Sequence, residues 1–385
     1  MRIAIITYHF PESTIPLAKH LVSDNCTVDY YYIFRYKSSK NIPGFDISNA
    51  SLYFGLNKLY YEDAPETFKY IDKCRINLYV IYLPPKLNIF LIRKIFLSFI
   101  IFQINIKKYD LINIVGQEKL LIPFHQKLNC LKKIHTLHEV TDHFNNKNLD
   151  NPLIEYLLKN KIKIIVHSEN SFKKICCYAN CYMSLIFIIP FGVFETYLKY
   201  EPVYLIPSSI KFILFFGYIH PYKGLDILSN AINLLQDNLT DIKFVIAGSG
   251  HIAELEYLKK NEKCIVINRH LTNNELVGLN KTAQFIVCPY KSASQSGIIM
   301  TTFLFGKPII ASNVGAFSEV ITDGVNGMLV NPNSPGELAA AITKLITEKE
   351  LVDKLQLGVN NFSKLQKYNW PDIAQKTKQV YFSDN

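Results

Sequence analysis

The chain has 385 residues, of which 49% are hydrophobic and 19% charged, so it is long enough for two domains with separate cores and too apolar for a disordered protein. Its formal net charge of +10 favours anionic partners, but no compact block of lysine and arginine indicates a nucleic-acid-binding protein. The first residues run directly into a strand-like segment, so we expect no signal peptide and a cytoplasmic protein.

Through the first half of the chain, short runs rich in β-branched residues alternate with helical patterns. Strands that are apolar throughout and alternate with helices indicate a parallel sheet covered on both faces. The predicted strands are residues 2–7, 27–33, 78–82, 111–115, 133–137, 163–166 and 185–189, with helices at 13–22, 151–160 and 170–178 among them.

A break follows this first unit. Residues 196–210 hold two prolines and little periodicity, which is typical of a linker, so the first domain is expected to span residues 1–195. The alternation restarts in a second domain, residues 211–366, and a last helix follows at 367–385. Two doubly wound sheets of this kind predict an α/β fold with a ligand crevice at the carboxyl ends of the strands. The predicted strands of the second domain are 212–216, 243–247, 264–267, 285–288, 308–311 and 328–330, and its predicted helices are 224–236, 252–260, 273–280, 297–305, 317–321 and 335–347.

The loop before the helix at 297–305 consists of small or polar residues, Ser-Ala-Ser-Gln-Ser-Gly from Ser292 to Gly297. Such residues leave the first backbone N–H groups of a helix free and allow a ligand to come close. Because free N–H groups and the helix dipole attract anions, the loop predicts a diphosphate site. An ordinary capped helix is the alternative.

Lys223 lies in a turn between a strand and a helix, just before Gly224. A lysine there places a cation beside a helix N-terminus, where an anion already binds favourably. Gly217, directly after the strand, suits close approach of the backbone to a ligand. The alternative for Lys223 is a solvated side chain in a first helical turn.

A second glycine turn, from Ala247 through Gly248 to Gly250, follows the strand at 243–247. It is not a full GxGxxG because residue 253 is alanine, so it is weak evidence for dinucleotide binding. It fits a second glycine turn on the rim of a ligand site.

Histidines gather where the strand at 133–137 ends. His138 is expected to face the crevice because the strand stops there. A metal site formed by His135, His138 and His143 is one interpretation, but the spacing matches no standard metal-binding pattern, so a hydrogen-bonding or structural histidine is favoured.

Metal binding elsewhere is also disfavoured. A zinc site from Cys176, Cys177 and Cys181 lacks a second pair of ligands at finger spacing, and the eight cysteines lie mostly in apolar runs, as reduced core residues do. The sequence has no Asp-x-Asp motif to hold a metal on a diphosphate, so we expect no metal there.

In combination these motifs resemble family 4 of the retaining glycosyltransferases. The likeness is dense over residues 212–332 and sparse over 1–130. It implies the GT-B architecture, two Rossmann-like doubly wound domains facing a central cleft. The matching segments are 217–225, 244–250, 306–311, 314–319 and 323–327, with 136–139 and 189–193 resembling first-domain motifs and 368–370 resembling the tail that crosses back to the first domain.

Three departures from the family pattern affect the expected site. Ala293 and Thr301 stand where the family has two glutamates, and Tyr218 stands where it has an arginine. The glycine-rich loop after the first strand is replaced by residues 12–16, Glu-Ser-Thr-Ile-Pro. Thr301 would offer a ribose one hydroxyl, where a carboxylate accepts two bonds. The Gln-Ser-Gly run at 295–297 resembles the donor loop of bacterial enzymes that assemble surface polysaccharides.

The resemblance implies a metal-independent, retaining glycosyltransferase of the hexosyltransferase type, acting in polysaccharide or glycolipid assembly. The nucleotide sugar is then a substrate, the acceptor a saccharide or lipid-linked hydroxyl, and no cofactor is needed. The implied catalytic residues are Lys223 and His138, and the implied donor-binding residues are Gly217, Gly248, Arg269, Gln295, Ser296, Gly297, Thr301, Gly315 and Glu319. A non-catalytic sugar-nucleotide-binding partner subunit of an active transferase is the alternative, which the missing glutamates favour, and a GT-B epimerase is a third.

Residues 86–108 form an apolar run with Arg93 and Lys94 inside it and Lys107 and Lys108 at its end. Because charges interrupt the run, it is not expected to span a bilayer. The favoured interpretation is a helix packed on the first sheet. The alternative is a helix that docks on an anionic membrane surface at the inner face of the cell membrane, with basic residues at headgroup level and Phe90, Phe96 and Phe99 below.

Overall fold

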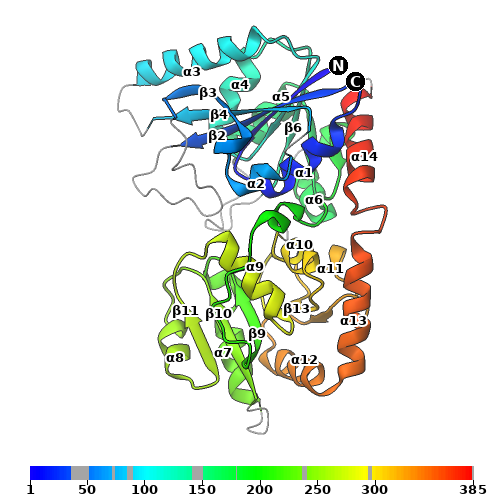
Figure 1. Ribbon diagram of the computed structural model, residues 1–385. Helices are drawn as coiled ribbons and strands as arrows, with labels where there is room; N and C mark the ends of the chain where they lie inside the picture. Colours follow the sequence, from blue (N-terminus) through cyan, green and yellow to red (C-terminus); the bar gives the residue numbers. More distant parts are fainter. Residues whose placement is uncertain are drawn as a thin grey trace. The chain divides into compact units, whose positions relative to one another are not determined.

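The structure is a computed structural model that describes residues 1–35, 52–71, 74–84, 90–140, 151–178, 180–235, 241–293 and 297–383. The chain folds into two compact units (Figure 1). Unit 1 comprises Met1–Lys199 together with Gln366–Asn385, and unit 2 comprises Tyr200–Leu365. The first boundary between the units lies within the predicted linker, residues 196–210.

Unit 1 is built on an eight-stranded sheet in the order β3-β4-β2-β1-β5-β6-β7-β8. All neighbouring strands are parallel except β3 and β4, which pair antiparallel. The order reverses between β1 and β5, the point at which doubly wound sheets open a ligand site at their carboxyl edge. The strands are β1 Arg2–Tyr8, β2 Thr27–Arg35, β3 Gly55–Leu59, β4 Ile76–Leu83, β5 Leu111–Val115, β6 Lys132–Thr136, β7 Lys163–Val166 and β8 Ile186–Ile188.

The edge strand β3 is absent from the sequence prediction. Its residues, Gly-Leu-Asn-Lys-Leu, include only two large apolar side chains, so no apolar run marks it. Antiparallel pairing with β4 holds it in place. The helices of unit 1 are α1 Pro11–Leu21, α2 Glu66–Lys69, α3 Phe90–Asn105, α4 Ile122–Lys127, α5 Pro152–Lys159, α6 Glu169–Tyr178 and α14 Trp370–Phe382.

Helix α14 joins the C-terminal residues to the core of unit 1. The indole Nε1 of Trp370 donates to the carbonyl of Val193 at 2.9 Å, and Asn113 Nδ2 donates to the hydroxyl of Tyr381 at 2.7 Å. A Cβ on Gly192 would lie 2.5 Å from the Tyr368 carbonyl, so only glycine allows this close contact.

Helix α3 has apolar side chains on two faces. Its inner face, which includes Leu97, Ile100 and Ile104, is buried in the core beneath the sheet, as the favoured interpretation predicted. Phe96 is partly buried against this core, and its alternative place at a membrane surface stays a prediction. The side chains of Phe90 and Arg93 lie outside the described residues. None of the helices in the described ranges is long and apolar enough to cross a membrane.

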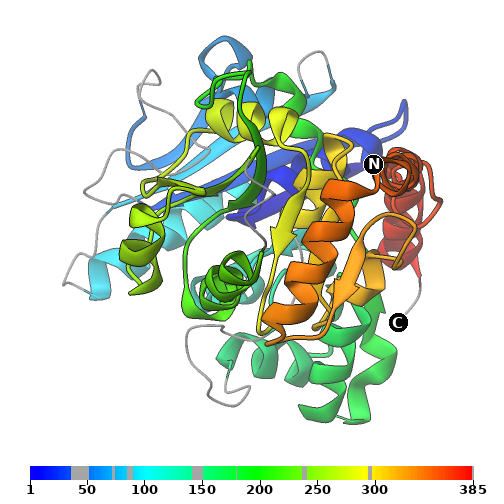
Figure 2. The same ribbon diagram turned by 90° about the horizontal axis from the view of Figure 1, so that it is seen from below.

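Unit 2 contains a six-stranded sheet in the order β11-β10-β9-β12-β13-β14, parallel throughout. Figure 2, seen from below, shows helix α12 (orange) beside the strands of this sheet. The strands are β9 Lys211–Phe216, β10 Ile242–Ala247, β11 Cys264–Ile267, β12 Ile286–Cys288, β13 Ile309–Ser312 and β14 Met328–Val330. The helices are α7 Leu225–Leu234, α8 Glu254–Lys260, α9 Asn273–Thr282, α10 Gly297–Leu304, α11 Phe317–Val320, α12 Pro335–Thr347 and α13 Lys349–Phe362.

Both sheets consist mainly of strands that are apolar on both faces. β5 is buried along its whole length, and β10 is buried at all but one position. Parallel strands covered by helices on both sides have this composition. The predicted α/β fold with two doubly wound parallel sheets is therefore confirmed.

Candidate functional site

In unit 2 the strand order reverses between β9 and β12, so the segments that follow these strands meet at one edge of the sheet. The segment after β9 contains a 3₁₀ turn, Pro221–Lys223, and the segment after β12 contains Pro289 and Tyr290. Gly224 has a φ of 68°, and a Cβ there would lie 1.9 Å from the Pro289 carbonyl. Glycine therefore lets the lysine turn pack directly on the end of β12.

Lys223 is buried at this edge, with 7% of its surface exposed and its Nζ 5.2 Å from the centre of the Tyr290 ring. Its expected alternative, a solvated lysine, is therefore wrong. Burial lowers the pKa of Lys223 from 10.5 to about 8, and the Cys288 thiol opposes the shift. Within the described ranges Lys223 forms no salt bridge. A buried ammonium without a carboxylate is costly, so the site favours an anionic ligand.

The N-terminal turn of α10 lies beside this lysine. A Cβ on Gly217 would lie 2.9 Å from Lys223 Nζ and 3.5 Å from Cδ1 of Ile298, in the first turn of α10. The structure thus brings Gly217, Lys223 and the beginning of α10, including Gly297, together. A helix N-terminus and a buried cation at one point both attract a diphosphate. Gln295 and Ser296 lie outside the described residues, so their contacts with a donor stay predictions.

The two glycine turns of unit 2 lie against each other. Gly248 has a φ of 150°, and a Cβ there would lie 1.9 Å from the carbonyl oxygen of Gly217. Gly217 N donates to the Ala247 carbonyl at 3.0 Å. The backbone of one turn therefore packs directly on the backbone of the other.

Gly315 lies against Ala293, and Glu319 follows in the next helix. Gly315 has a φ of 53°, and a Cβ would lie 1.6 Å from the Ala293 carbonyl, so the loop before α10 rests on glycine backbone. Glu319, in α11, is half-buried. Their expected role in shaping the donor pocket stays a prediction.

Thr301 and Arg269 have internal partners. Thr301 is 4% exposed, and its hydroxyl donates to the Gly297 carbonyl at 2.9 Å, so its one proton is used within α10. Arg269 forms a bidentate pair with Glu275 at 2.8 and 2.7 Å. This arginine holds the pKa of Glu275 down to about 2. Neither contact requires a ligand, and their donor contacts stay predictions.

In unit 1, His138 lies just beyond the end of β6 in a cage of aromatic side chains. The ring of Phe10 is stacked on it at 4.0 Å, the ring of His167 is 4.6 Å away and that of Phe191 is 5.9 Å away. Ser13 Oγ lies 3.1 Å from its Nε2. Burial, and then the charge of His167, keep the pKa of His138 well below its ordinary value.

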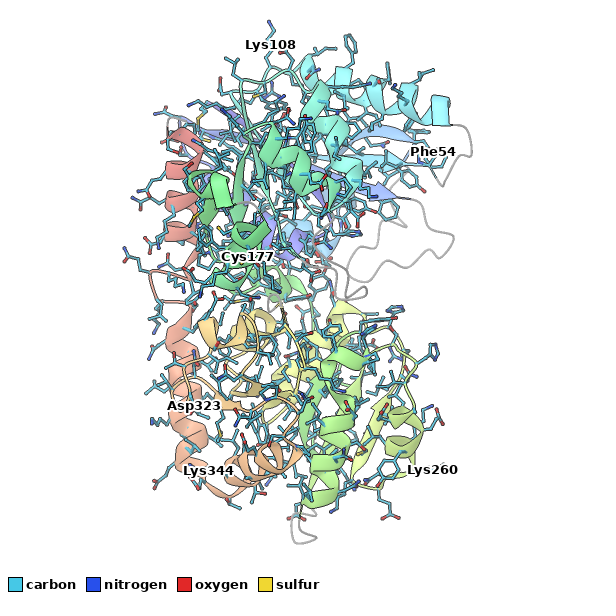
Figure 3. All side chains as sticks on the ribbon, turned by 180° about the vertical axis from the view of Figure 1, so that it is seen from behind. Phe54, Lys108, Cys177, Lys260, Asp323 and Lys344 are labelled. Carbon is cyan, nitrogen blue, oxygen red and sulfur yellow. The ribbon has the colours of Figure 1, made fainter. Side chains whose placement is uncertain are left out.

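The metal interpretations receive no support from the histidines and cysteines. His135 uses both ring nitrogens, with Nδ1 2.8 Å from His125 Nε2 and Nε2 2.8 Å from the Gly116 carbonyl. Cys176 is buried, whereas Cys177 (labelled in Figure 3) is exposed, so the two thiols do not share an environment. His143 and the side chain of Cys181 lie outside the described residues. Where side chains are described, no three metal-ligating groups gather.

Several neighbours of the candidate residues were not predicted from the sequence. Tyr290 and Cys288 surround Lys223, and Phe10 and Ser13 contact His138. The first pair could have been found from the strand order, because the residues that follow β12 must meet those that follow β9. The second pair gives no local signal.

We compared the chain with known protein families and solved structures. Residues 210–348 match the family model described as glycosyl transferases, group 1. An uncharacterized glycosyltransferase of Methanocaldococcus jannaschii is 31% identical over 183 residues, which cover 45% of this chain and 48% of the relative. The chain spans about half the length of the curated relatives it matches.

Solved structures resemble the chain over nearly its whole length. HepE of Anabaena, in complex with UDP and glucose, has a TM-score of 0.65 at 16% identity and covers 99% of each chain. WaaG, a glycosyltransferase involved in lipopolysaccharide biosynthesis, has a TM-score of 0.63 at 12% identity and covers 100% of each chain. Residues 210–348 thus resemble the group 1 glycosyl transferases, and the chain that contains them has the GT-B fold.

Proposed function

We propose that the protein is a retaining glycosyltransferase that moves a sugar from a nucleotide-sugar donor to an acceptor hydroxyl. The observation that carries the proposal is the buried Lys223, which has no acidic partner in the described ranges and lies beside the N-terminus of α10. A diphosphate would supply the missing negative charge. The family match over residues 210–348 includes this site, and a solved GT-B neighbour binds UDP and glucose.

In the proposed reaction, the bond from the sugar to the diphosphate breaks, and charge develops on the departing diphosphate. Donors fixed in advance at that charge supply the largest part of such catalysis. Lys223 and the first N–H groups of α10 are placed to do this. The departing diphosphate would itself accept the proton of the acceptor hydroxyl, so no carboxylate base is required. His138 would contact the donor sugar.

The proposal includes independence from metal ions. The sequence has no Asp-x-Asp motif to hold a metal ion. The cation of Lys223 and the dipole of α10 would together stabilise the negative charge of the diphosphate. Transfer should therefore continue in EDTA. A strict requirement for added Mn²⁺ or Mg²⁺ would contradict this part of the proposal.

A donor screen tests the proposal directly. We expect one class of UDP-, GDP- or dTDP-sugar to raise the melting temperature, because a ligand at a hundred times its Kd adds about 2.7 kcal/mol to the stability of the folded state. The anomeric configuration of the product, read by NMR, then tests retention. No stabilisation by any donor would argue against the proposal. A non-catalytic binding subunit would be stabilised by a donor without releasing its sugar.

We also propose that helix α3 carries the acceptor side of the protein to an anionic membrane surface. The helix has a second apolar face with Ile95, Phe99 and Phe102, which Ile106 continues directly after the helix, and each of the four is 59–63% exposed. Their spacing of four, three and four residues places them on one side of a helix. This outer face, the α3 stripe, lies opposite the buried inner face.

The charges around the α3 stripe favour a lipid surface over a second copy of the chain as its partner. Lys94, Lys108 (Figure 3) and Lys127 are exposed near it, and Lys127 Nζ contacts Ser98 of α3 at 2.7 Å. Residues 73–109 contain no aspartate or glutamate. Two copies would bring like charges together, whereas anionic headgroups attract each lysine by about 1 kcal/mol. Lys107 is engaged by Tyr79 and is not counted among these lysines.

Co-sedimentation with vesicles tests the membrane proposal. Vesicles of phosphatidylglycerol and phosphatidylcholine should retain the protein at low salt, and pure phosphatidylcholine should retain less. Replacing Phe99 and Phe102 by serine should release it, whereas Leu357→Ser, at an equally exposed site in unit 2, should not. If all variants stay in the supernatant, or if the double variant instead changes a dimer to a monomer, the lipid assignment is wrong.

A further inference from the structure

The edge of the unit 1 sheet at which β6 and β7 begin borders a cavity of about 440 Å³. Tyr381 and Ser383, at the end of α14, also line this cavity. None of its described lining residues is acidic, and four are lysines, namely Lys132, Lys133, Lys161 and Lys163. Doubly wound sheets bind their substrates at the carboxyl edge, where His138 lies, so this cavity is at the opposite edge of the sheet.

Two of the four lysines are fixed in the walls of the cavity. Lys163 is 7% exposed, and its Nζ donates to the carbonyl and the hydroxyl of Ser383 at 2.6 and 2.9 Å, which joins β7 to the end of α14. Lys133 is half-buried, and its Nζ donates to the carbonyls of His125 and Leu128 at 2.8 and 3.0 Å. These neutral partners position both side chains and leave the positive charge of Lys133 in place.

The other two lysines, Lys132 and Lys161, are exposed. Because β6 and β7 pair in parallel, the two residues come to the same edge of the sheet. In the described ranges neither of them nor Lys133 forms a salt bridge. The segments that carry them, residues 119–138 and 156–168, contain no aspartate or glutamate. Positive charges gathered without an acidic side chain repel one another, and a bound anion would relieve this repulsion.

The backbone of Lys161 is strained. Its φ of 53° lies in the left-handed region that favours glycine, and glycine is the residue that commonly follows the end of a helix such as α5. Lys108, after the end of α3, has a φ of 51° and is also exposed (Figure 3). Strain kept at an exposed side chain favours a function for that side chain. The alternative is a purely structural role, because a cation also stabilises the negative end of a helix dipole.

Apolar side chains lie beside the lysines. Leu131 lines the cavity and is fully exposed, and the ring of Phe382, 39% exposed, lies 5.7 Å from Lys132 Nζ. A ligand whose anionic group is joined to an apolar group would cover these two side chains. The volume of the cavity lies within the range of about 300–1,000 Å³ that is typical of small-molecule sites.

We propose that this cavity is a second anion site, which binds the phosphate of a monoester other than the nucleotide-sugar donor. A phosphate monoester carries a charge of about −1.5 to −2 at pH 7, which two exposed lysines would neutralise. Lys132 and Lys161 contact the phosphate, and Lys133 adds its charge from the wall. The proposal does not rest on the proposed function, since no step of sugar transfer uses these lysines. The monoester is either a soluble molecule or the headgroup of a lipid.

Acetylation of lysines by acetic anhydride, followed residue by residue with mass spectrometry, tests the site without any activity. A bound monoester should slow the acetylation of Lys132 and Lys161 relative to sodium chloride of equal ionic strength. Lys344, an exposed lysine of unit 2 (Figure 3), is the control and should react at the same rate in both. Lys223→Ala, which removes the cation proposed to bind the donor, should leave the protection unchanged, so failure of the proposed function would not affect this result.

Two probes separate the sources of the phosphate. Glycerol 3-phosphate is a soluble monoester, and vesicles of phosphatidic acid in phosphatidylcholine present the same group on a lipid. Protection by glycerol 3-phosphate assigns a soluble ligand, whereas protection by phosphatidic acid alone assigns a lipid. Vesicles of phosphatidylglycerol at equal surface charge are the control, because their phosphate is a diester. Protection by neither probe, or equal protection by phosphatidylglycerol and phosphatidic acid, would overturn the proposal.

Lys161→Gly separates binding from a structural role. Glycine adopts the left-handed conformation without strain, so the midpoint of urea unfolding should stay the same or rise. The variant should also weaken binding of the probe that protects Lys132 by roughly twofold to fivefold, the range for one exposed ion pair, and Lys161→Arg should retain the affinity. A lower urea midpoint with unchanged protection of Lys132 would assign Lys161 to the dipole of α5 and contradict the proposal.

Discussion

The pKa of Lys223 depends on whether an anionic ligand is bound beside it. Burial brings its pKa down to about 8, so the empty protein loses this proton at mildly alkaline pH. A diphosphate at the same site would stabilise the ammonium and raise the pKa again. Binding and protonation are therefore linked at this residue.

From this linkage we predict that donor affinity falls as the pH rises above about 8, and that binding at pH 9 takes up a proton through Lys223. Calorimetric titration in two buffers of different ionisation enthalpy measures the uptake. Lys223→Arg, which stays charged at pH 9, should bind without proton uptake. Equal affinity and no proton uptake in the wild type at pH 7 and 9 would contradict the placement of Lys223 at the diphosphate.

The glycines beside Lys223 differ in what a methyl group would meet. At Gly217 the methyl would press on the flexible end of Lys223, 2.9 Å away, and at Gly248 it would press on backbone, 1.9 Å away. We predict that Gly217→Ala chiefly weakens donor binding, whereas Gly248→Ala chiefly lowers the melting temperature; both also carry the strain of a positive φ, about 1–3 kcal/mol. Gly336→Ala, in open space on α12, is the control and should stabilise by up to about 1 kcal/mol. Loss of stability without loss of affinity in Gly217→Ala would count against its role in the site.

Among the elements, helix α3 shows how one apolar run can have two uses. Its inner side chains fill the core of unit 1, and its outer side chains form the α3 stripe. Sequence alone does not separate the two faces, because both are apolar and the usual polar face of a surface helix is missing.

Substitutions on the two faces of α3 should therefore differ in their effect on stability. Ile100 is fully buried, so Ile100→Ala should lower the free energy of unfolding by about 2–5 kcal/mol. Phe99 is 59% exposed, so Phe99→Ala should change it by less than about 0.5 kcal/mol. Urea unfolding checks both variants. A large loss in Phe99→Ala would mean that the outer face is covered within the protein itself.

The sequence predicts elements well where one physical signal dominates. Strands such as β5 and β10 are apolar runs buried on both faces, and their predicted and observed limits differ by at most one residue. The edge strand β3 has no such run, and only its pairing with β4 defines it. Local sequence patterns predict elements that bury their own side chains. An element held by pairing with a distant strand can be predicted only once the fold is known.

The candidate site shows the same division. The turn that carries Lys223 is visible as a strand, a glycine and a lysine before a helix, because backbone geometry requires those residue types locally. The stack of Phe10 on His138 joins residues far apart in the sequence, and the strand order alone brings them together. Hydroxyls such as that of Thr301 are assigned to backbone partners only once the helix is known.

At the scale of the whole molecule, buried histidines link stability to pH. His135 is fully buried, and burial lowers its pKa to about 4, below the ordinary value of 6.5. Between pH 6.5 and 4 the unfolded chain binds a proton that the folded chain does not, so stability falls as the pH falls through this window.

We predict that His135 alone makes the folded state about 2 kcal/mol less stable at pH 5 than at pH 7. Urea unfolding at the two pH values measures this difference, and the other buried histidines add to it. A stability that is flat from pH 7 to pH 5 would contradict a neutral, buried His135.

The central claim is that the buried lysine at the switch point of unit 2 binds the diphosphate of a nucleotide sugar during transfer. Turnover of UDP-, GDP- and dTDP-sugars by the wild type and by folded Lys223→Ala tests this most directly. We predict that the wild type turns over at least one donor and that Lys223→Ala lowers kcat by roughly 100- to 1,000-fold, the range for removing one donor aimed at developing charge. Turnover by Lys223→Ala at the wild-type rate would contradict the claim.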